Sequence, residues 1–120
     1  MALTESGLSC SPSYLEACSE LRDAVCNGCG SANAKFDLVP NTVYGVSIAE
    51  ACNIHDWDYY IGKTNEDKEL ADRRMRNNGV RIVDGQSANT LSRWLRRKRV
   101  LSYYLAVKHF GGPAFWKGKE

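Results

Sequence analysis

The sequence has no long hydrophobic run, and this absence excludes one large class of protein. No apolar stretch among its 120 residues approaches the roughly 18–20 residues that a membrane-spanning helix requires. Residues 1–13 have neither the basic region nor the apolar region of a secretory signal peptide. We therefore expect no transmembrane segment and a chain that is cytoplasmic as synthesised. Export, or carriage in a virion, is left open as a route to a later site of action.

Histidine is scarce, since His55 and His109 are the only two in the chain. A phosphohydrolase of the His-Asp type needs several metal-binding histidines, so this class is excluded. The five cysteines are an odd number, which leaves at least one thiol free or paired with another chain. Cys26 and Cys29 form the single Cys-x-x-Cys pair, and without a second pair a structural zinc site is disfavoured.

The small net charge of +2 hides a division between the two parts of the chain. Residues 1–72 contain twelve Asp or Glu and four Lys or Arg, whereas residues 73–120 contain two and twelve. A basic segment of this kind is suited to an anionic partner, either a phospholipid surface or a nucleic acid. The simpler interpretation is that the acidic and basic parts pair with each other, and the sequence leaves both open.

Strand and hairpin signals are also few, and we find no internal repeat. Hydrophobic residues recur at helical spacing in four segments. We expect helices over about residues 12–26, 48–61, 65–76 and 90–110. Residues 77–79, Asn-Asn-Gly, are expected to end the third helix, with a short extended piece at 80–83. The prediction is an all-α fold, with a loose leader at 1–10 and a single domain at 11–120.

Local signals predict where the helices begin and which sides they bury. Ser47 and Glu50 fit a capping box, Thr64 or Asn65 is expected to cap the third helix, and Asn89 or Thr90 the fourth. Leu70, Ala71 and Met75 are expected to face inward. So is the apolar stripe of the fourth helix, which consists of Leu91, Trp94, Leu95, Leu101, Tyr104 and Leu105.

The stretch from residue 51 to 60 carries the strongest chemical signal. On a helix, Cys52, His55 and Tyr59 lie at i, i+3 and i+7, and Asp56 lies one turn after Cys52. A disulfide between Cys52 and Cys29 would hold the small-residue loop at 28–33 against the Asp56 carboxylate. Loop carbonyls and a carboxylate are the oxygen ligands that calcium prefers, and His55 beside them is suited to take a proton from water.

These residues resemble the secreted phospholipase A2 superfamily, most closely its short bacterial and viral members. The family helix reads Cys-Cys-x-x-His-Asp-x-Cys-Tyr, and this chain matches it at Cys52, His55, Asp56 and Tyr59. The family calcium loop, Tyr-x-Cys-Gly-x-Gly, is similar to residues 28–32 read through Cys29. The resemblance covers about residues 26–77. It implies a compact helical fold with two antiparallel central helices, a calcium loop and flanking helices.

The resemblance also implies a role for each matching residue. His55 would activate water, and Asp56 would bind Ca²⁺ together with the backbone carbonyls of Gly28, Gly30 and Ala32. The amide of Gly30 would help hold the oxyanion. A second aspartate on the antiparallel helix would orient the histidine; Asp72 is in the expected place, and Asp67 is the rival. Tyr59 matches a tyrosine that hydrogen-bonds this aspartate, and Tyr103 or Tyr104 is expected to supply a second such bond.

Some positions depart from the family pattern. Ala51 and Asp58 replace two family cysteines, and Ala32 replaces a glycine of the calcium loop. An alanine held at a positive φ costs on the order of 1 kcal/mol. Such a cost would weaken calcium binding.

The function expected from the resemblance is calcium-dependent hydrolysis of the sn-2 ester of phospholipids at a membrane surface. The residues expected to contact the membrane are Arg96, Arg97, Arg99 and Trp116. One alternative is a calcium-binding or membrane-binding protein of the same fold without catalysis. Another is a nucleic-acid-binding module built on Arg93–Arg99, which is disfavoured because the aromatic residues there fit a helical core better than a base-stacking surface.

Overall fold

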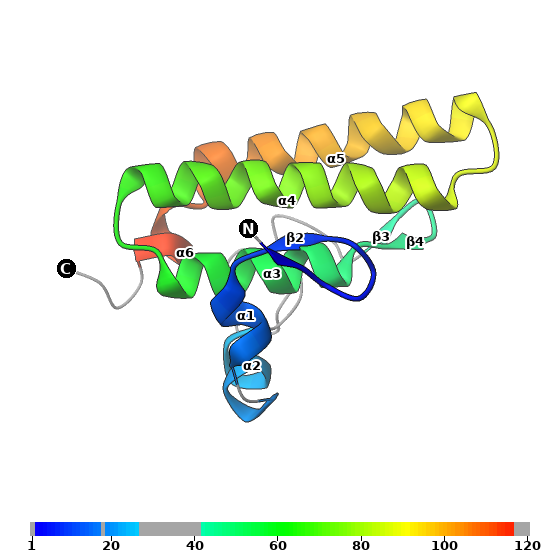
Figure 1. Cartoon of the computed structure of the whole chain (residues 1–120). Coiled ribbons are helices and arrows are strands. Elements are labelled where there is room, and N and C mark those ends of the chain that lie inside the picture. Colours follow the sequence, from blue (N-terminus) through cyan, green and yellow to red (C-terminus); the bar gives the residue numbers. More distant parts are fainter. Residues whose placement is uncertain (1, 18, 27–41, 117–120) are drawn as a thin grey trace.

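Three long helices, stacked side by side, make up most of the molecule (Figure 1). They are α3 (Ala49–Ile61), α4 (Asn65–Gln86) and α5 (Thr90–Phe110), and α4 lies in the middle between the other two. The computed structural model describes residues 2–17, 19–26 and 42–116. The expectation of a mostly helical protein is confirmed.

Short elements cover the ends and one side of the stack. α1 (Pro12–Glu16) and α2 (Ser19–Val25) lie beside α3, and α6 (Gly112–Trp116) follows α5. Two short antiparallel hairpins were not expected. They pair β1 (Ala2–Leu3) with β2 (Ser9–Cys10), and β3 (Thr42–Val43) with β4 (Val46–Ser47). Tyr44 and Gly45, at φ values of 45° and 83°, make the tight turn between β3 and β4.

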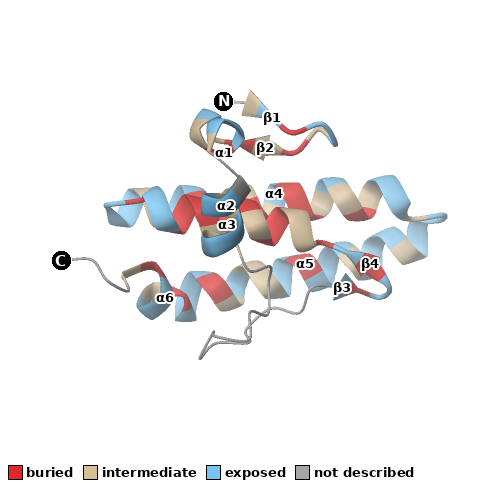
Figure 2. Ribbon diagram, turned by 90° about the horizontal axis from the view of Figure 1, so that it is seen from below, coloured by how far each residue is buried: buried red, intermediate tan, exposed pale blue. Residues whose placement is uncertain are grey.

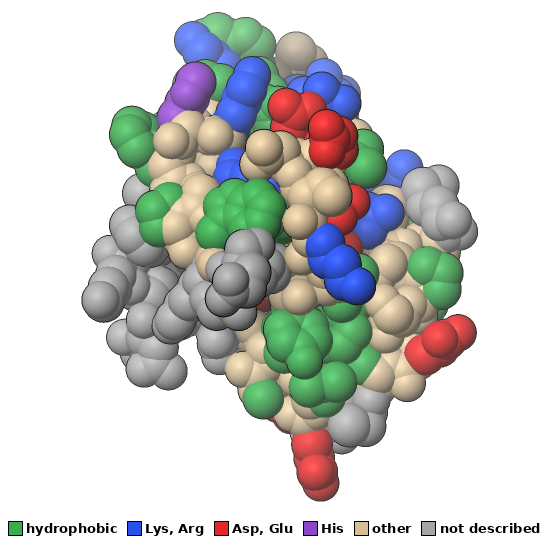
Figure 3. Space-filling view, turned by 90° about the vertical axis from the view of Figure 1, so that its left-hand side faces the viewer, with side chains coloured by type: hydrophobic (Ala, Val, Ile, Leu, Met, Phe, Trp, Pro, Cys, Tyr) green, Lys and Arg blue, Asp and Glu red, His purple; other side chains and the backbone are tan. Residues whose placement is uncertain are grey.

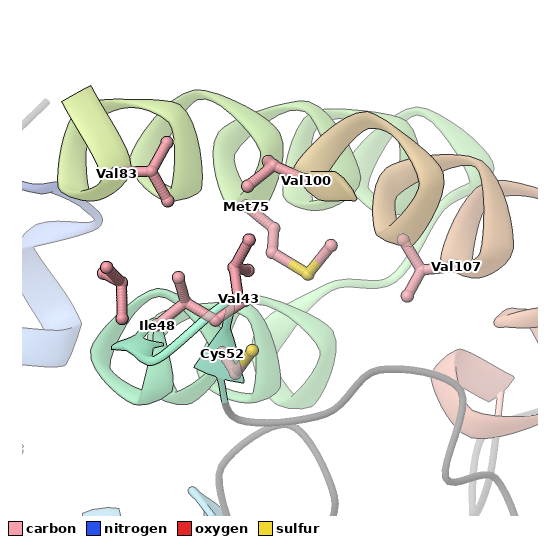
Figure 4. Packing of buried hydrophobic residues seen from close by; sticks show 8 residues of the cluster. Val43, Ile48, Cys52, Met75, Val83, Val100 and Val107 are labelled. Carbon is pink, nitrogen blue, oxygen red and sulfur yellow. The ribbon is translucent and has the colours of Figure 1, made fainter. Parts of the chain in front are cut away.

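The main core lies where the three long helices and the β3–β4 hairpin meet (Figure 4). Its buried side chains are of modest size, with Met75 and Val83 from α4, and Val100 and Val107 from α5. The remaining members are Val43 and Val46 from the hairpin, Ile48 immediately before α3, and Cys52 from α3. Burial of these apolar side chains is what holds α3 and α5 against α4.

Two of the three expected helix caps are confirmed. The Thr64 side chain accepts from the backbone N–H of Asp67, and Asp67 bonds back to the backbone N–H of Thr64, which completes a capping box. Asn89 caps α5 by accepting from the N–H of Ser92 at 2.8 Å. At α3 the expected box is absent because Ile48 is the cap residue, and the carboxylate of Glu50 instead accepts from the hydroxyl of Ser6.

The helix end expected at residues 77–79 was wrong, since α4 continues through them to Gln86. Asn78 does not compete with the helix backbone because its side chain bonds both the N–H and the C=O of Ser9, each at 2.8 Å. Gly79 faces α5, where an added Cβ would lie 2.9 Å from a methyl group of Val100. Tertiary contacts therefore explain why helix-breaking residues stand inside this helix.

Two expectations for the N-terminal part also need correction. Residues 2–10 were expected to be a loose leader, but they form the β1–β2 hairpin and bury Leu8 and Cys10. The single helix expected over 12–26 is two short helices, because Ala17 adopts an extended backbone with ψ of 143°.

The inward stripe predicted for the last long helix was mostly wrong. α5 buries Val100 and Val107, and its larger residues Leu91, Trp94, Leu95, Leu101 and Leu105 are exposed. Figure 2 shows the same pattern, with buried segments confined to narrow bands of α5. Leu70 was also expected inside, and it is 61% exposed. Ala71 and Met75 are buried as expected.

The close approach of α4 and α5 at Gly79 gives a stability prediction. Gly79→Ala should destabilise the protein, because the new methyl group must displace the buried Val100 side chain. Gly85→Ala, in the same helix but with open space around it, should gain up to about 1 kcal/mol from helix propensity. The measurement is urea denaturation of both variants. The account is wrong if Gly79→Ala remains destabilising when Val100 is also changed to alanine.

Candidate functional site

The predicted histidine and aspartate meet between α3 and α4. The Nε2 atom of His55 lies 2.7 Å from Oδ1 of Asp72, and both residues are buried. His55 comes from the middle of α3, and Asp72 from the second turn of α4. The contact expected between these two side chains is confirmed.

Two further groups donate hydrogen bonds to the same carboxylate. The hydroxyl of Tyr59 donates to Oδ1 at 2.6 Å, and Nζ of Lys68 donates to Oδ2 at 2.8 Å. Burial alone would raise the pKa of Asp72, but the hydrogen bonds from His55, Lys68 and Tyr59 outweigh it and lower the pKa. Burial and the neighbouring carboxylate raise the pKa of Tyr59, so its hydroxyl remains a donor. Asp72 is therefore held ionised.

This arrangement fixes the role of each nitrogen of the His55 ring. An ionised carboxylate can only accept, so the Nε2 atom of His55 must donate to Asp72. In the neutral imidazole the free lone pair is then on Nδ1. The Tyr59 ring lies against the imidazole at a centroid distance of 4.1 Å, which restricts its rotation. The geometry gives a fixed imidazole with a proton-accepting nitrogen.

Lys68 is a member of the site that the sequence analysis missed. Its Nζ also donates to the backbone carbonyl of Val107 at 3.0 Å, which ties the last turn of α5 to the buried carboxylate. The spacing of four residues between Lys68 and Asp72 is that of an oppositely charged pair on one helix face, and this signal was available from the sequence.

Other candidates for the aspartate and its partners have different places in the structure. Asp67, the rival aspartate, accepts from the backbone N–H groups of Lys63 and Thr64 at the start of α4. Tyr103 donates to the carbonyl of Thr42, and the Tyr104 ring lies near Arg76 and Lys108. The expectation that Tyr103 or Tyr104 would bond the aspartate was wrong, and Lys68 makes the additional bond.

The expected calcium site is only partly within the described residues. Asp56 lies on α3 next to His55, and its side chain is partly exposed. Gly28, Gly30 and Ala32, with the expected carbonyl ligands and the Gly30 amide, lie outside the described residues. Within the described ranges, no group of three His, Cys, Asp or Glu side chains could hold a metal ion. The calcium loop therefore stays a prediction.

The cysteines within the described residues are of two kinds. Cys52 is disulfide-bonded and buried in the core against Met75 and Val43 (Figure 4). Its expected partner, Cys29, lies outside the described residues, so this pairing stays a prediction. Cys10 and Cys26 are free thiols, and burial raises the pKa of both, to about 12 for Cys26. A raised pKa keeps a thiol protonated and weakly nucleophilic.

A second charge pair, between partly buried Arg74 and buried Asp58, joins α3 to α4 near the first. Nη1 of Arg74 donates to both carboxylate oxygens of Asp58, at 3.0 and 3.2 Å. Burial raises the pKa of Asp58, and Arg74 opposes this effect. The pair lines a cavity of about 220 Å³ with Ile61 and Leu70, and neither His55 nor Asp72 lines it. At this end of the molecule, hydrophobic patches lie among charged side chains of both signs (Figure 3).

The arginines expected to contact a membrane make contacts within the protein. Arg96 donates to the carbonyl of Tyr44, and Arg99 donates to the hydroxyl of the same residue. Arg97 pairs with Asp84. The Trp116 ring is half-buried beside Phe115, at a centroid distance of 4.9 Å. The three arginines hold the β3–β4 hairpin and the end of α4 to α5. The membrane contact expected for these arginines and Trp116 stays a prediction.

The lowered pKa of Asp72 predicts how stability depends on pH. The unfolded chain should titrate at the ordinary Asp value of about 3.9, so the ionised carboxylate stabilises the fold above about pH 4. This stabilisation is lost as the pH falls through the lowered pKa of the folded state. In urea denaturation below pH 4, Asp72→Asn should therefore lose stability less steeply than the wild type. Asp58 has a raised pKa, so its contribution to stability falls as the pH rises from about 4 to that raised value, and in this window Asp58→Asn should change the slope in the opposite direction.

A second prediction concerns Lys68, whose charge is largely shielded from water at 13% side-chain exposure. Lys68→Met removes the cation from a buried carboxylate and should lower the unfolding free energy at pH 7 by about 2–3 kcal/mol. Lys63→Met, at an exposed position, should change it by less than about 0.5 kcal/mol. Thermal and urea denaturation check both values, and equal effects at the two positions would contradict this account.

Comparison of the chain with protein-family models, with curated proteins and with solved structures found no match. The functional interpretation therefore depends on the geometry of the chain's own residues.

Proposed function

We propose that the protein is a calcium-dependent phospholipase A2-type hydrolase, which cleaves the sn-2 ester of phospholipids and releases a fatty acid and a lysophospholipid. The observation that carries this proposal is the buried contact between His55 and Asp72, with Tyr59 on the same carboxylate oxygen. The phospholipase A2 resemblance predicted both of these contacts, which join residues far apart in the sequence. The mostly helical fold is consistent with it.

The described side chains are suited to general-base chemistry. Asp72 fixes the imidazole through Nε2 and stabilises positive charge that develops on the ring. The free lone pair on Nδ1 can then accept a proton from a water molecule that attacks an ester carbonyl. Tyr59 and Lys68 keep the carboxylate ionised throughout, so the proton resides on His55 until the leaving alcohol takes it. This sequence of transfers needs no other titratable side chain.

The chemistry of the donors suits calcium as the cofactor. Asp56 supplies a partly exposed carboxylate beside His55, and the expected carbonyl ligands at residues 28, 30 and 32 are hard oxygen donors. A bound calcium ion would polarise the ester carbonyl and stabilise the oxyanion. Cys52, through its disulfide, anchors the turn of α3 that precedes Asp56.

Hydrolysis of phospholipid vesicles by the purified protein is the direct test. Fatty-acid release should require added calcium and stop when a chelator removes it. His55→Gln should lower the rate by at least about 1000-fold, because general-base assistance is lost, while calcium affinity stays within about twofold. Calorimetry measures the affinity separately from the activity.

Asp56→Asn gives the complementary result, since it should weaken calcium binding first and reduce turnover as a consequence. Tyr60→Phe, at an exposed position on the same helix, is the matched control and should leave both properties unchanged. Calcium binding without any fatty-acid release would contradict the proposal and favour a non-catalytic protein of this fold. Loss of calcium affinity in His55→Gln would make His55 a structural residue.

A further inference from the structure

The outer face of α5 is a long apolar surface that no described element covers. Leu91, Trp94, Leu95, Leu101 and Leu105 are between 40% and 65% exposed. Their spacing of three, four and seven residues places them along one side of the helix, opposite the buried Val100 and Val107. We call these five residues the outer stripe. An exposed apolar surface of this length is unusual unless something binds it.

The charges that α5 itself places beside the outer stripe are all positive, and one of them, Arg97, pairs with Asp84 of α4. α5 contains Lys and Arg but no Asp or Glu. The exposed cations that flank the stripe or lie within it are Arg93, Arg97, Lys98, Arg99 and Lys108. Lys98 extends over the Trp94 ring at 4.5 Å, so its charged end and the aromatic ring share one part of the surface. A helix with leucines and a tryptophan on one face and only cations around them is complementary to an anionic lipid interface.

We propose that α5 lies in the plane of an anionic membrane, with the outer stripe in the headgroup and acyl boundary and the flanking cations at the phosphates. Its 21 residues give a surface about 31 Å long. None of the described helices combines the length and apolar character needed to cross a bilayer. Lys and Arg side chains can bury their stems while their charged ends stay in water, so they do not prevent shallow insertion.

The charges on α5 argue against two other partners for this surface, a second copy of the chain and a nucleic acid. A second copy of the chain paired through this face would bring two sets of cations together without an acidic partner on α5. A nucleic acid would match the cations but would leave the leucines without an apolar partner.

The inference goes beyond the proposed hydrolysis and does not depend on it. The outer stripe lies on the side of α5 opposite its buried face, whereas His55 and Asp72 meet between α3 and α4. Membrane binding through the stripe can therefore be measured in the absence of calcium and of a cleavable ester.

The test uses vesicles of ether-linked phospholipids, which contain no ester bond to hydrolyse, in a buffer with chelator. The wild type should co-sediment with phosphatidylglycerol vesicles far more strongly than with phosphatidylcholine vesicles. Leu101→Gln combined with Leu105→Gln should reduce the partition coefficient at least about tenfold. The matched control is Leu15→Gln combined with Leu70→Gln, which changes two leucines of similar exposure outside α5 and should bind as the wild type does.

Tryptophan fluorescence locates the bound surface directly. Trp57 is buried and Trp116 is half-buried, so a blue shift on vesicle binding should come from Trp94 and disappear in Trp94→Phe. All variants change exposed side chains, and thermal denaturation should confirm that they fold. Equal vesicle binding by the α5 double variant and by the control double variant would overturn the proposal. It would also be overturned if the wild type did not bind vesicles but formed a dimer that the α5 double variant cannot form. Preferential binding of duplex DNA, unchanged in the α5 double variant, would overturn it as well.

Discussion

A buried carboxylate must be fully hydrogen-bonded, and this constraint connects the fold to the candidate site. Asp72 is 2% exposed, and an ionised group removed from water at this depth is strongly unfavourable without partners. The partners come from His55 and Tyr59 on α3 and from Lys68 on α4, which also bonds the last turn of α5. Satisfying one carboxylate therefore positions all three long helices. A change at any of these donors affects both stability and the proposed chemistry.

Features that follow from local rules were predictable from the sequence. The caps Thr64 and Asn89 follow from the backbone donors that every helix start leaves without a partner, and the side chains nearby satisfy them. The place of His55 and Tyr59 on one side of α3 follows from their spacing of four residues. Asp72 lies on another helix, and its contact with these residues was predicted through the phospholipase A2 resemblance alone.

Features that depend on a distant partner were not predictable in this way. From the sequence alone, Asn78 and Gly79 favour a break in the helix. In the structure the backbone of Ser9 hydrogen-bonds the Asn78 side chain, and the Val100 side chain fills the space beside Gly79. The pairing of Lys68 with Asp72 could have been expected from their spacing of four residues, but the bond from Lys68 to the Val107 carbonyl, 39 residues away, could not. Periodicity identified an apolar stripe on α5, but it does not indicate whether that stripe meets the protein or another surface.

The inner side of α5 carries small buried side chains, and its outer side carries large exposed ones. On the inner side, Gly79 lets the helices approach closely, so only small side chains such as Val100 fit between them. The larger leucines and Trp94 are on the outer side, which is the reverse of what burial alone would favour. The exposed parts of these leucines add no stability to the isolated chain, because they remain in water. Their arrangement among cations is therefore explained better by binding to an anionic lipid interface than by the packing of the protein itself.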